Sequence, residues 1–358
     1  MNNKAVIAMS GGVDSSVAAY LMKQRGFDCI GVTMKLFANE DIGISREHSC
    51  CSLDDVEDAR SVAYSLDMPY YVFNFSDRFE TDVIDRFIHA YENGITPNPC
   101  IDCNRYLKFD KLYMRAKELD RDYVVTGHYA RVEKDENGRF LLKKALDDTK
   151  DQSYVLYCLT QEQLSHTIFP LGEMRKSQAR EIAESQGFIN ARKADSQDIC
   201  FVQNGSYADF IEQYTGKNYP DGDFLDTNGN VIGRHKGVIR YTVGQRKGLG
   251  ISAPEPLYVK AVNPVSNTVT LSYNDGLYSS VVKAGDINLI SVPEIKGEMR
   301  VKAKVRYRHT EQWATVTQNG DTITAVFDEP QRAVTCGQAL VLYDGDTVVG
   351  GGTIIEVE

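Results

Sequence analysis

The sequence has no apolar run that approaches the roughly 18 residues needed to cross a membrane. Its first residues lead into a short strand-like segment, not into the apolar core of a signal peptide. Internal repeats and low-complexity tracts are also absent from the sequence. The 358 residues are 42% hydrophobic and 25% charged, which excludes disordered and collagen-like chains. We therefore expect a cytoplasmic globular protein with two or three domains, at about 150 residues per domain.

Cysteine is scarce. Eight cysteines in a chain of this length are too few for a disulfide scaffold, so clustered cysteines indicate catalysis or metal binding. We predict that three of them are small buried hydrophobes, because they lie in apolar segments: Cys29, Cys158 and Cys336. The others lie in loop-like surroundings: Cys50, Cys51, Cys100, Cys103 and Cys200. We interpret the vicinal pair Cys50 and Cys51 as structural or incidental, because neighbouring cysteines do not easily converge on one metal.

Positive charge is in deficit. Forty Lys and Arg stand against 50 Asp and Glu, and a net charge of -10 taken alone argues against nucleic-acid binding. The distribution changes that inference, because residues 231–250 carry five basic groups and none acidic. Residues 301–310 carry four basic groups, and period-two alternation places them on one strand face: Lys302, Lys304, Arg306 and Arg308. Such a face is either simply solvated or binds phosphates, and we favour phosphate binding.

The first 200 residues alternate short apolar runs with amphipathic stretches. We predict strands at 4–9, 29–36, 70–75 and 123–126, with helices between them. This pattern indicates an α/β domain with a doubly wound parallel sheet, which binds ligands at the carboxyl ends of its strands. Turn dipeptides and β-branched runs follow. They predict a small central domain at 201–280 and a C-terminal β-barrel or sandwich at 281–358.

The Walker A motif is absent, which excludes a GTPase-type phosphate loop. The first predicted strand is followed by SGGVDSS at 10–16. Two glycines allow a ligand to approach the backbone closely, and hydroxyls with the free amides of a helix N-terminus suit a phosphate. A second glycine-rich string at 248–253 precedes Pro254 and opens no helix, so it is a poor dinucleotide site. SGGVDSS resembles the PP-loop of ATP pyrophosphatases, which transfer AMP to a substrate oxygen.

The second motif is NPCIDCN at 98–104, in which Cys100 and Cys103 form a CxxC pair. A redox pair, half of a zinc site and a pair of cluster ligands all fit this spacing. Zinc would need two further ligands, and the sequence has no second CxxC and no HxxxH. Cys200 is the remaining loop-placed thiol. ATP activation of an oxygen combined with these thiols predicts oxygen-to-sulfur exchange, in which a cysteine persulfide supplies sulfur and a second thiol releases it by disulfide formation.

Seven motifs occur in one order along nearly the whole chain: SGGVDSS, NPCIDCN, TGHYAR at 126–131, KDQSYVLY at 150–157, DSQDICF at 195–201, YTVGQRKGLGI at 241–251 and VRYRH at 305–309. This set resembles the bacterial tRNA-specific 2-thiouridylases, the MnmA/TrmU family. The resemblance implies a PP-loop domain, a small central domain and a C-terminal β-barrel. It also implies that ATP and Mg²⁺ are used to adenylate O2 of the wobble uridine of a tRNA, and that sulfur then displaces AMP.

The resemblance further implies roles for single residues. ATP would be bound by Ala8, Met9, Ser10, Gly11, Gly12, Val13, Asp14, Ser15, Met34 and Gly127. The target base would meet Asn98, Pro99 and Cys100. Cys103 would be the nucleophile, and Cys200 would carry a persulfide supplied by a donor such as a cysteine desulfurase or a sulfur-relay protein. The tRNA contacts would be His128, Lys150, Asp151, Gln152, Arg306, Tyr307 and Gln338.

One position departs from the pattern of the family. Many members carry Asp where this chain has Cys100, and cysteine cannot copy the hydrogen bonding of a carboxylate. Cys100, Cys103 and Cys200 could therefore hold an iron-sulfur cluster that delivers sulfide; we favour the persulfide. Two further hypotheses remain. A PP-loop amide ligase would need neither tRNA nor paired cysteines, and a non-catalytic metal-binding RNA module would leave SGGVDSS unexplained.

Overall fold

The structure is a computed structural model that describes residues 2–37, 53–195, 199–202 and 206–358. Cys50 and Cys51 lie outside the described residues, so the interpretation of that pair stays a prediction. The chain divides into two compact units. The first comprises Met1–Ile84, Pro99–Asn204 and Gly345–Val349, and the second comprises Asp85–Asn98, Gly205–Asp344 and Gly350–Glu358.

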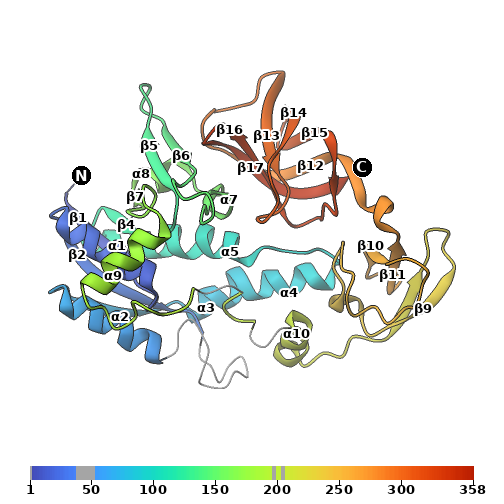
Figure 1. Cartoon of the computed structure of the whole chain (residues 1–358), viewed down its shortest axis with the longest axis horizontal. Helices are drawn as coiled ribbons and strands as arrows, with labels where there is room; N and C mark the ends of the chain where they lie inside the picture. Colours follow the sequence, from blue (N-terminus) through green and yellow to red (C-terminus); the bar gives the residue numbers. More distant parts are fainter. Residues whose placement is uncertain (1, 38–52, 196–198, 203–205) are drawn as a thin grey trace. The chain divides into compact units, whose positions relative to one another are not determined.

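The first unit is built on a parallel sheet with the strand order β3-β2-β1-β4-β7 (Figure 1). Its strands are β1 (Lys4–Ala8), β2 (Asp28–Lys35), β3 (Tyr70–Asn74), β4 (Tyr123–Val125) and β7 (Thr167–Ile168). All neighbouring strands pair in parallel, which confirms the predicted doubly wound sheet. Chain order reverses between β1 and β4, and ligands bind at such a switch point in open α/β sheets. The segment that follows β1 is SGGVDSS.

Helices α1 (Val13–Gln24), α2 (Leu53–Ser65) and α9 (Lys176–Ser185) belong to the same unit (Figure 1). α1 packs against α9. Both helices place small residues in the core, and Ala18 and Ala179 are fully buried. Small side chains let two helix backbones approach closely, so the first residue of α9 lies beside the first turn of α1.

The segment after β3 is almost continuously helical. It contains α3 (Ser76–Phe79), a π-helix η1 (Glu80–Ile84), α4 (Asp85–Glu92), α5 (Pro99–Asp102), a second π-helix η2 (Cys103–Lys111) and α6 (Leu112–Glu118). Of these elements, α4 belongs to the second unit and the others belong to the first. Our prediction of loop-like surroundings for Cys100 and Cys103 was wrong, because Cys100 lies in α5 and Cys103 begins η2. The physical reason is Pro99, the first residue of α5: the fixed φ of proline suits the first turn of a helix. π-helical turns often occur at functional sites.

The rest of the first unit includes a hairpin that the sequence analysis did not predict. The hairpin consists of β5 (Arg131–Lys134) and β6 (Phe140–Lys143), and it is followed by α7 (Ser153–Leu156) and α8 (Gln161–Ser165). Lys143 of β6 also pairs with Thr347, the first residue of β17. These elements are short and partly exposed, so their hydrophobic pattern is weak.

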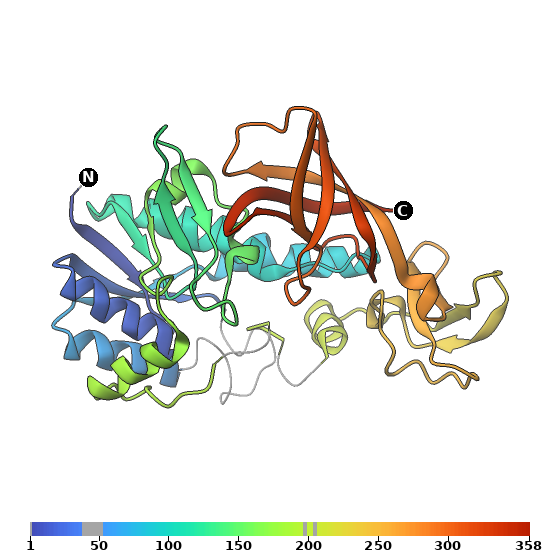
Figure 2. The same cartoon turned by 45° about the horizontal axis from the view of Figure 1, so that its top comes forward.

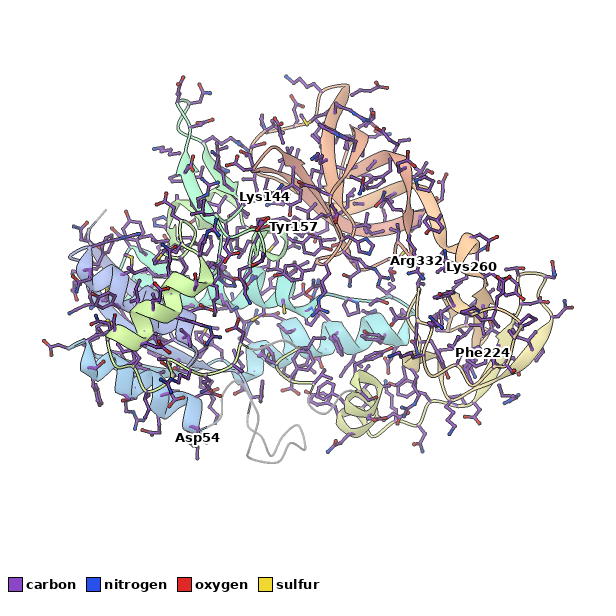
Figure 3. All side chains as sticks on the ribbon, viewed as in Figure 1. Asp54, Lys144, Tyr157, Phe224, Lys260 and Arg332 are labelled. Atoms are coloured by element: carbon purple, nitrogen blue, oxygen red, sulfur yellow. The ribbon has the colours of Figure 1, made fainter. Side chains whose placement is uncertain are left out.

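The central part of the second unit is a small mixed sheet with the order β10-β11-β8-β9. Its elements are α10 (Tyr207–Thr215), β8 (Gly222–Leu225), β9 (Val231–His235), the 3₁₀ turns η3 (Val238–Arg240) and η4 (Asn274–Leu277), β10 (Tyr258–Asn263) and β11 (Thr268–Ser272). Phe224, labelled in Figure 3, is fully buried. Its ring packs edge-on against His235 and Tyr241, with centroids 5.4 and 5.2 Å away.

The C-terminal part of the second unit is a closed antiparallel barrel (Figure 2). Its strands are β12 (Tyr278–Leu289), β13 (Glu298–Lys304), β14 (Gln312–Asn319), β15 (Thr322–Arg332), β16 (Ala339–Asp344) and β17 (Thr347–Val357). β12 pairs with both β15 and β17, which closes the barrel and confirms the predicted fold class. We predicted that Lys302, Lys304, Arg306 and Arg308 share one strand face. This prediction was wrong for Arg306 and Arg308, because β13 ends at Lys304. None of the described helices is long and apolar enough to cross a membrane.

Candidate active site

The SGGVDSS segment forms a tight turn between β1 and α1. Gly11 has a φ of +71°, and a Cβ there would lie 2.4 Å from the backbone oxygen of Asp55. Glycine is therefore required both by conformation and by space. Ser15 Oγ accepts from the Ser10 amide at 3.2 Å and donates to the Gly12 carbonyl at 3.0 Å, which fixes the loop. Gly12 is the N-cap of α1 and supplies no side-chain cap, so the first-turn amides of α1 suit an anion.

The residues expected to bind ATP gather at the carboxyl ends of three adjacent strands. The PP-loop follows β1, Met34 lies one residue before the end of β2, and Gly127 lies two residues beyond β4. A Cβ on Gly127 would lie 2.7 Å from the carbonyl carbon of Asp14 and 2.8 Å from the amide nitrogen of Ser15. The turn after β4 thus lies directly against the first turn of α1.

Asp14 is held by two side chains that sequence reasoning did not select. The Tyr129 hydroxyl donates to Asp14 Oδ1 at 2.8 Å. Lys176 Nζ donates to both carboxylate oxygens of Asp14, at 2.8 and 2.7 Å. Burial and the negative charge of Asp14 raise the pKa of Tyr129, so its phenol stays protonated and remains a donor. Asp14 therefore stands at the phosphate loop as a fixed carboxylate.

Lys176 also contacts Asp195, which belongs to the segment that leads to Cys200. Its Nζ lies 2.8 Å from Asp195 Oδ1, and Lys150 and Arg180 each reach the same carboxylate at 2.9 Å. Burial alone would raise the pKa of Asp195, but hydrogen bonds from Lys176 and Lys150 lower it to about 2. The carboxylate is therefore ionised at neutral pH and links α9, the KDQSYVLY segment and the DSQDICF segment.

Asn190 is a further residue that the sequence did not indicate. It is buried, and its amide nitrogen donates to the Gly11 carbonyl and to Ser16 Oγ, both at 2.9 Å. Its amide oxygen is buried without a hydrogen-bond partner among the described residues. Asn190 lies more than 170 positions from the loop that it braces, and no motif surrounds it, so only the tertiary contact reveals its role.

The three candidate thiols belong to the first unit and differ in exposure. Cys103 is 9% exposed, Cys200 is half-buried and Cys100 is exposed. Among the described residues, no group of three His, Cys, Asp or Glu side chains could hold a metal ion. The iron-sulfur alternative stays a hypothesis.

Two neighbouring residues fix the helix that carries Cys103. The buried Asn104 amide donates to the Val155 carbonyl at 3.0 Å, which ties the helix to α7. The Cys158 thiol lies 3.7 Å from the Ile101 carbonyl, and burial raises its pKa to about 12. Cys158 and Cys29 are buried, as predicted, whereas Cys336 is only half-buried.

Comparison with known proteins covers the whole chain. Residues 3–204 match the family model described as tRNA methyl transferase HUP domain, 208–273 the tRNA methyl transferase PRC-barrel domain and 279–354 the aminomethyltransferase beta-barrel domain. The tRNA-specific 2-thiouridylase MnmA of Clostridioides difficile is 52% identical over 99% of this chain and 98% of that protein. The protein of the same name from Lachnoclostridium phytofermentans is 52% identical over 99% of both chains. This chain belongs to the tRNA-specific 2-thiouridylase family.

His128, an expected tRNA contact, is only 9% exposed. Its ring centroid lies 6.0 Å from Phe109 and 5.8 Å from Phe169, and its Nδ1 lies 2.7 Å from Thr126 Oγ1. Burial, with a smaller contribution from the charge of Lys108, lowers the pKa of His128 well below 6.5. His128 is therefore neutral at physiological pH, and its contact with RNA stays a prediction.

The buried neutral histidine makes stability depend on pH. The unfolded chain binds a proton at His128 below about pH 6.5, whereas the folded chain does not, so this group costs stability as the pH falls. We expect wild type to lose up to about 1.4 kcal/mol per pH unit more than His128→Gln below that pH. Urea unfolding near neutral pH and one to two units lower measures the difference. The pKa values of His235 and His309 are also lowered, but both histidines remain in each protein. Equal losses in the two proteins would contradict the prediction.

The expected contacts at 150–152 have partners inside the first unit. Gln152 and Tyr129 exchange two hydrogen bonds of 2.9 Å, one through the Gln152 side chain and one between backbones. Asp151 accepts from the amides of Ala145 and Ser153, and Lys150 pairs with Asp195. The positioning of TGHYAR against KDQSYVLY is therefore a structural role of this segment.

Two expected contacts of the second unit hold loop backbones. Gln338 donates to the carbonyls of Thr96 and Pro97 at 3.0 and 3.2 Å, and thereby holds the stretch that leads to Asn98. Arg306 is half-buried and donates to the carbonyls of Val243 and Ala333 at 3.0 and 2.7 Å. Tyr307 is 40% exposed. An RNA contact of these residues remains a prediction.

Proposed function

We propose that this protein converts the wobble uridine of tRNA to 2-thiouridine in an ATP-dependent reaction. The observation that carries the proposal is the combination of an intact PP-loop at the switch point of the sheet with Cys103 and Cys200 in the same unit. Full-length relatives named tRNA-specific 2-thiouridylase support the substrate and the product. The alternative of a small-substrate amide ligase would leave the cysteines without a role.

ATP would bind through the PP-loop with Met34 and Gly127, at the strand ends where these residues gather. Asp14 offers carboxylate oxygens, which are the ligands that Mg²⁺ prefers, and Mg²⁺ would neutralise phosphate charge. O2 of the uridine attacks the α-phosphorus, the bond between the α-phosphorus and the bridging oxygen breaks, and pyrophosphate leaves. The uridine loses its N3 proton to solvent and is adenylated at O2, so AMP becomes a leaving group at C2; N3 takes up a proton again when the thiocarbonyl forms.

Sulfur transfer would follow at C2. The terminal sulfur of a Cys200 persulfide attacks C2, the C2–O2 bond breaks and AMP leaves, which gives a C2–S–S–Cys200 adduct. The Cys103 thiolate then attacks the Sγ of Cys200. The electron pair of the thiolate forms the Cys103–Cys200 disulfide. The bond between Cys200 Sγ and the sulfur on C2 breaks, and its electron pair stays on the sulfur of 2-thiouridine. A thiol reductant must reduce the disulfide by two electrons, and a persulfide donor must reload Cys200, before the next turnover.

Chemistry at C2 requires an unstacked base. We infer that Asn98, Pro99 and Cys100 receive the extruded uridine, and that the family contacts at His128, 150–152, Arg306, Tyr307 and Gln338 hold the tRNA. The proposed organisation is a catalytic domain at 1–200, a central domain at 201–280 and a barrel at 281–358. We also propose a cytoplasmic location, where tRNA and a desulfurase or sulfur-relay donor are available.

The descriptions of two matching family models mention methyl transfer, whereas the relatives are named for thiolation. The candidate site has a PP-loop, which suits activation by ATP, and two thiols that can carry sulfur. The residues of the candidate site therefore favour sulfur transfer.

The test is to incubate the protein with ATP, Mg²⁺, a persulfide donor and an anticodon stem-loop RNA that carries the wobble uridine. We expect 2-thiouridine by mass spectrometry, with AMP and pyrophosphate formed in equal amounts. An RNA with cytidine at the wobble position, and a reaction without ATP, should give none. Release of AMP and pyrophosphate without RNA would support the amide ligase instead. Activity that tracks the iron content of anaerobically prepared protein would support the cluster route.

A further inference from the structure

Lys176 is a buried charge beside the phosphate loop. It is the first residue of α9 and only 8% exposed, and its ammonium group donates to Asp14 and Asp195. Its backbone amide donates to Asp147 at 2.9 Å, which fixes the start of the helix. Burying a lysine costs free energy unless the charge is paired, so these partners are needed to keep it there.

Without a bound cation, the carboxylate of Asp14 would disfavour a nucleotide. It lies in the first turn of α1, where a carboxylate competes with phosphate for the helix amides and repels it. Lys176 Nζ lies 2.7–2.8 Å from both oxygens of Asp14 and neutralises it. The same ammonium group is thereby held at the end of α1 that attracts anions. A phosphate bound to the first-turn amides lies next to the position that Lys176 occupies.

Asp195 anchors Lys176 from the other side. It also accepts from Lys150 and Arg180, so the carboxylate is fixed by three cations. With this anchor, the flexible lysine stem can exchange Asp14 for a phosphate oxygen without moving α9. Arg180 is one helical turn beyond Lys176 on α9 and shares Asp195. Its guanidinium donates to Asp195 and to the Lys193 carbonyl.

We propose that Lys176 binds the β- and γ-phosphates of ATP, which leave as pyrophosphate, and that Asp195 positions its ammonium group. The inference rests on the proposed function, because it assigns a leaving-group contact to the adenylation step. When the bond between the α-phosphorus and the bridging oxygen breaks, its electron pair stays on the pyrophosphate. A cation at that oxygen stabilises the developing charge and the product.

The experiment compares the affinities of pyrophosphate, ATP and AMP for purified full-length variants by calorimetry, without RNA. Lys176→Met should weaken pyrophosphate and ATP binding by about tenfold or more and leave AMP within about twofold, because AMP lacks the β- and γ-phosphates. Lys176→Arg should restore much of the pyrophosphate affinity. Lys283→Met is the matched control, since it removes a lysine that also pairs with two carboxylates, Glu356 and Glu358, but lies in the barrel, and it should bind all three ligands as wild type does.

If Lys176 only connects α9 to α1, a different pattern is expected: the affinities for AMP and pyrophosphate fall together, or neither affinity falls. Either pattern in Lys176→Met overturns the inference. Should that variant fail to fold, Asp195→Asn provides the test, because Lys176 keeps Asp14 as a partner. Asp195→Asn should lower the affinity for pyrophosphate severalfold and leave the affinity for AMP unchanged. Equal effects on the two affinities overturn the inference. A different result would contradict the proposed function: a wild-type protein that binds pyrophosphate but does not thiolate the RNA.

Discussion

Replacing Cys103 or Cys200 by serine is expected to stop thiolation, with a loss on the order of a thousandfold or more. Serine has nearly the same size, so the buried position of Cys103 keeps its packing. A serine hydroxyl cannot carry a persulfide, and it is a far weaker nucleophile than a thiolate. ATP and tRNA should still bind. The measurements are the yield of 2-thiouridine and the two binding affinities.

The two serine variants should stop at different steps. Cys200→Ser cannot form the persulfide and should give no sulfur on the RNA. Cys103→Ser still allows the C2–S–S–Cys200 adduct, so it should accumulate an RNA–protein species that survives denaturation and is released by a thiol reductant. Gel electrophoresis with and without reductant distinguishes these outcomes. Absence of this adduct would count against the assigned order of the two cysteines.

Cys158→Ser is the matched control for both variants. Cys158 is buried close to the CxxC segment, but its pKa is raised to about 12, so it is not a thiolate at neutral pH. A serine there can donate to the same Ile101 carbonyl. We expect thiolation at a rate close to that of wild type. Wild-type activity in Cys103→Ser or Cys200→Ser would remove that cysteine from the mechanism.

A methyl group at Gly127 is expected to disturb ATP binding strongly. The added Cβ would lie 2.7 Å from the Asp14 carbonyl carbon and 2.8 Å from the Ser15 amide nitrogen. Backbone atoms cannot rotate away as a side chain can, so the first turn of α1 must shift. We expect Gly127→Ala to lose roughly 1–3 kcal/mol of stability. ATP affinity should fall on the order of tenfold or more, because the shifted amides no longer converge on the phosphates. Urea unfolding and calorimetry measure the two effects.

Gly285→Ala provides the control for added bulk at a glycine. A Cβ on Gly285 would meet only the Ile355 side chain, at an ordinary 3.5 Å. This residue lies in β12, so the substitution should change stability by less than about 1 kcal/mol and leave ATP affinity unchanged. A Gly127→Ala protein that binds ATP as tightly as wild type would show that the turn after β4 does not shape the nucleotide site.

The long strands of the first unit could be predicted because each is a local apolar run. β1 and β2 are buried along their centres, and a continuous apolar run is the pattern of a parallel strand covered on both faces. β7 has only two residues and β5 is half exposed, so neither carries enough local pattern to stand out. We did not predict that a helix begins at Pro99, because proline is common both in loops and at the first position of a helix.

The sequence by itself determined the fold class, the phosphate loop and the candidate cysteines. Each of these depends on residues that are close in the chain, so their spacing encodes the local geometry. Only the tertiary structure revealed that Lys176, Tyr129 and Asn190 brace the loop, because these residues lie more than 100 positions from it. From the sequence alone, a lysine is predicted to be an exposed surface charge. Packing of α9 against α1 buries Lys176 between Asp14 and Asp195, and it is this burial that gives the residue its proposed chemistry.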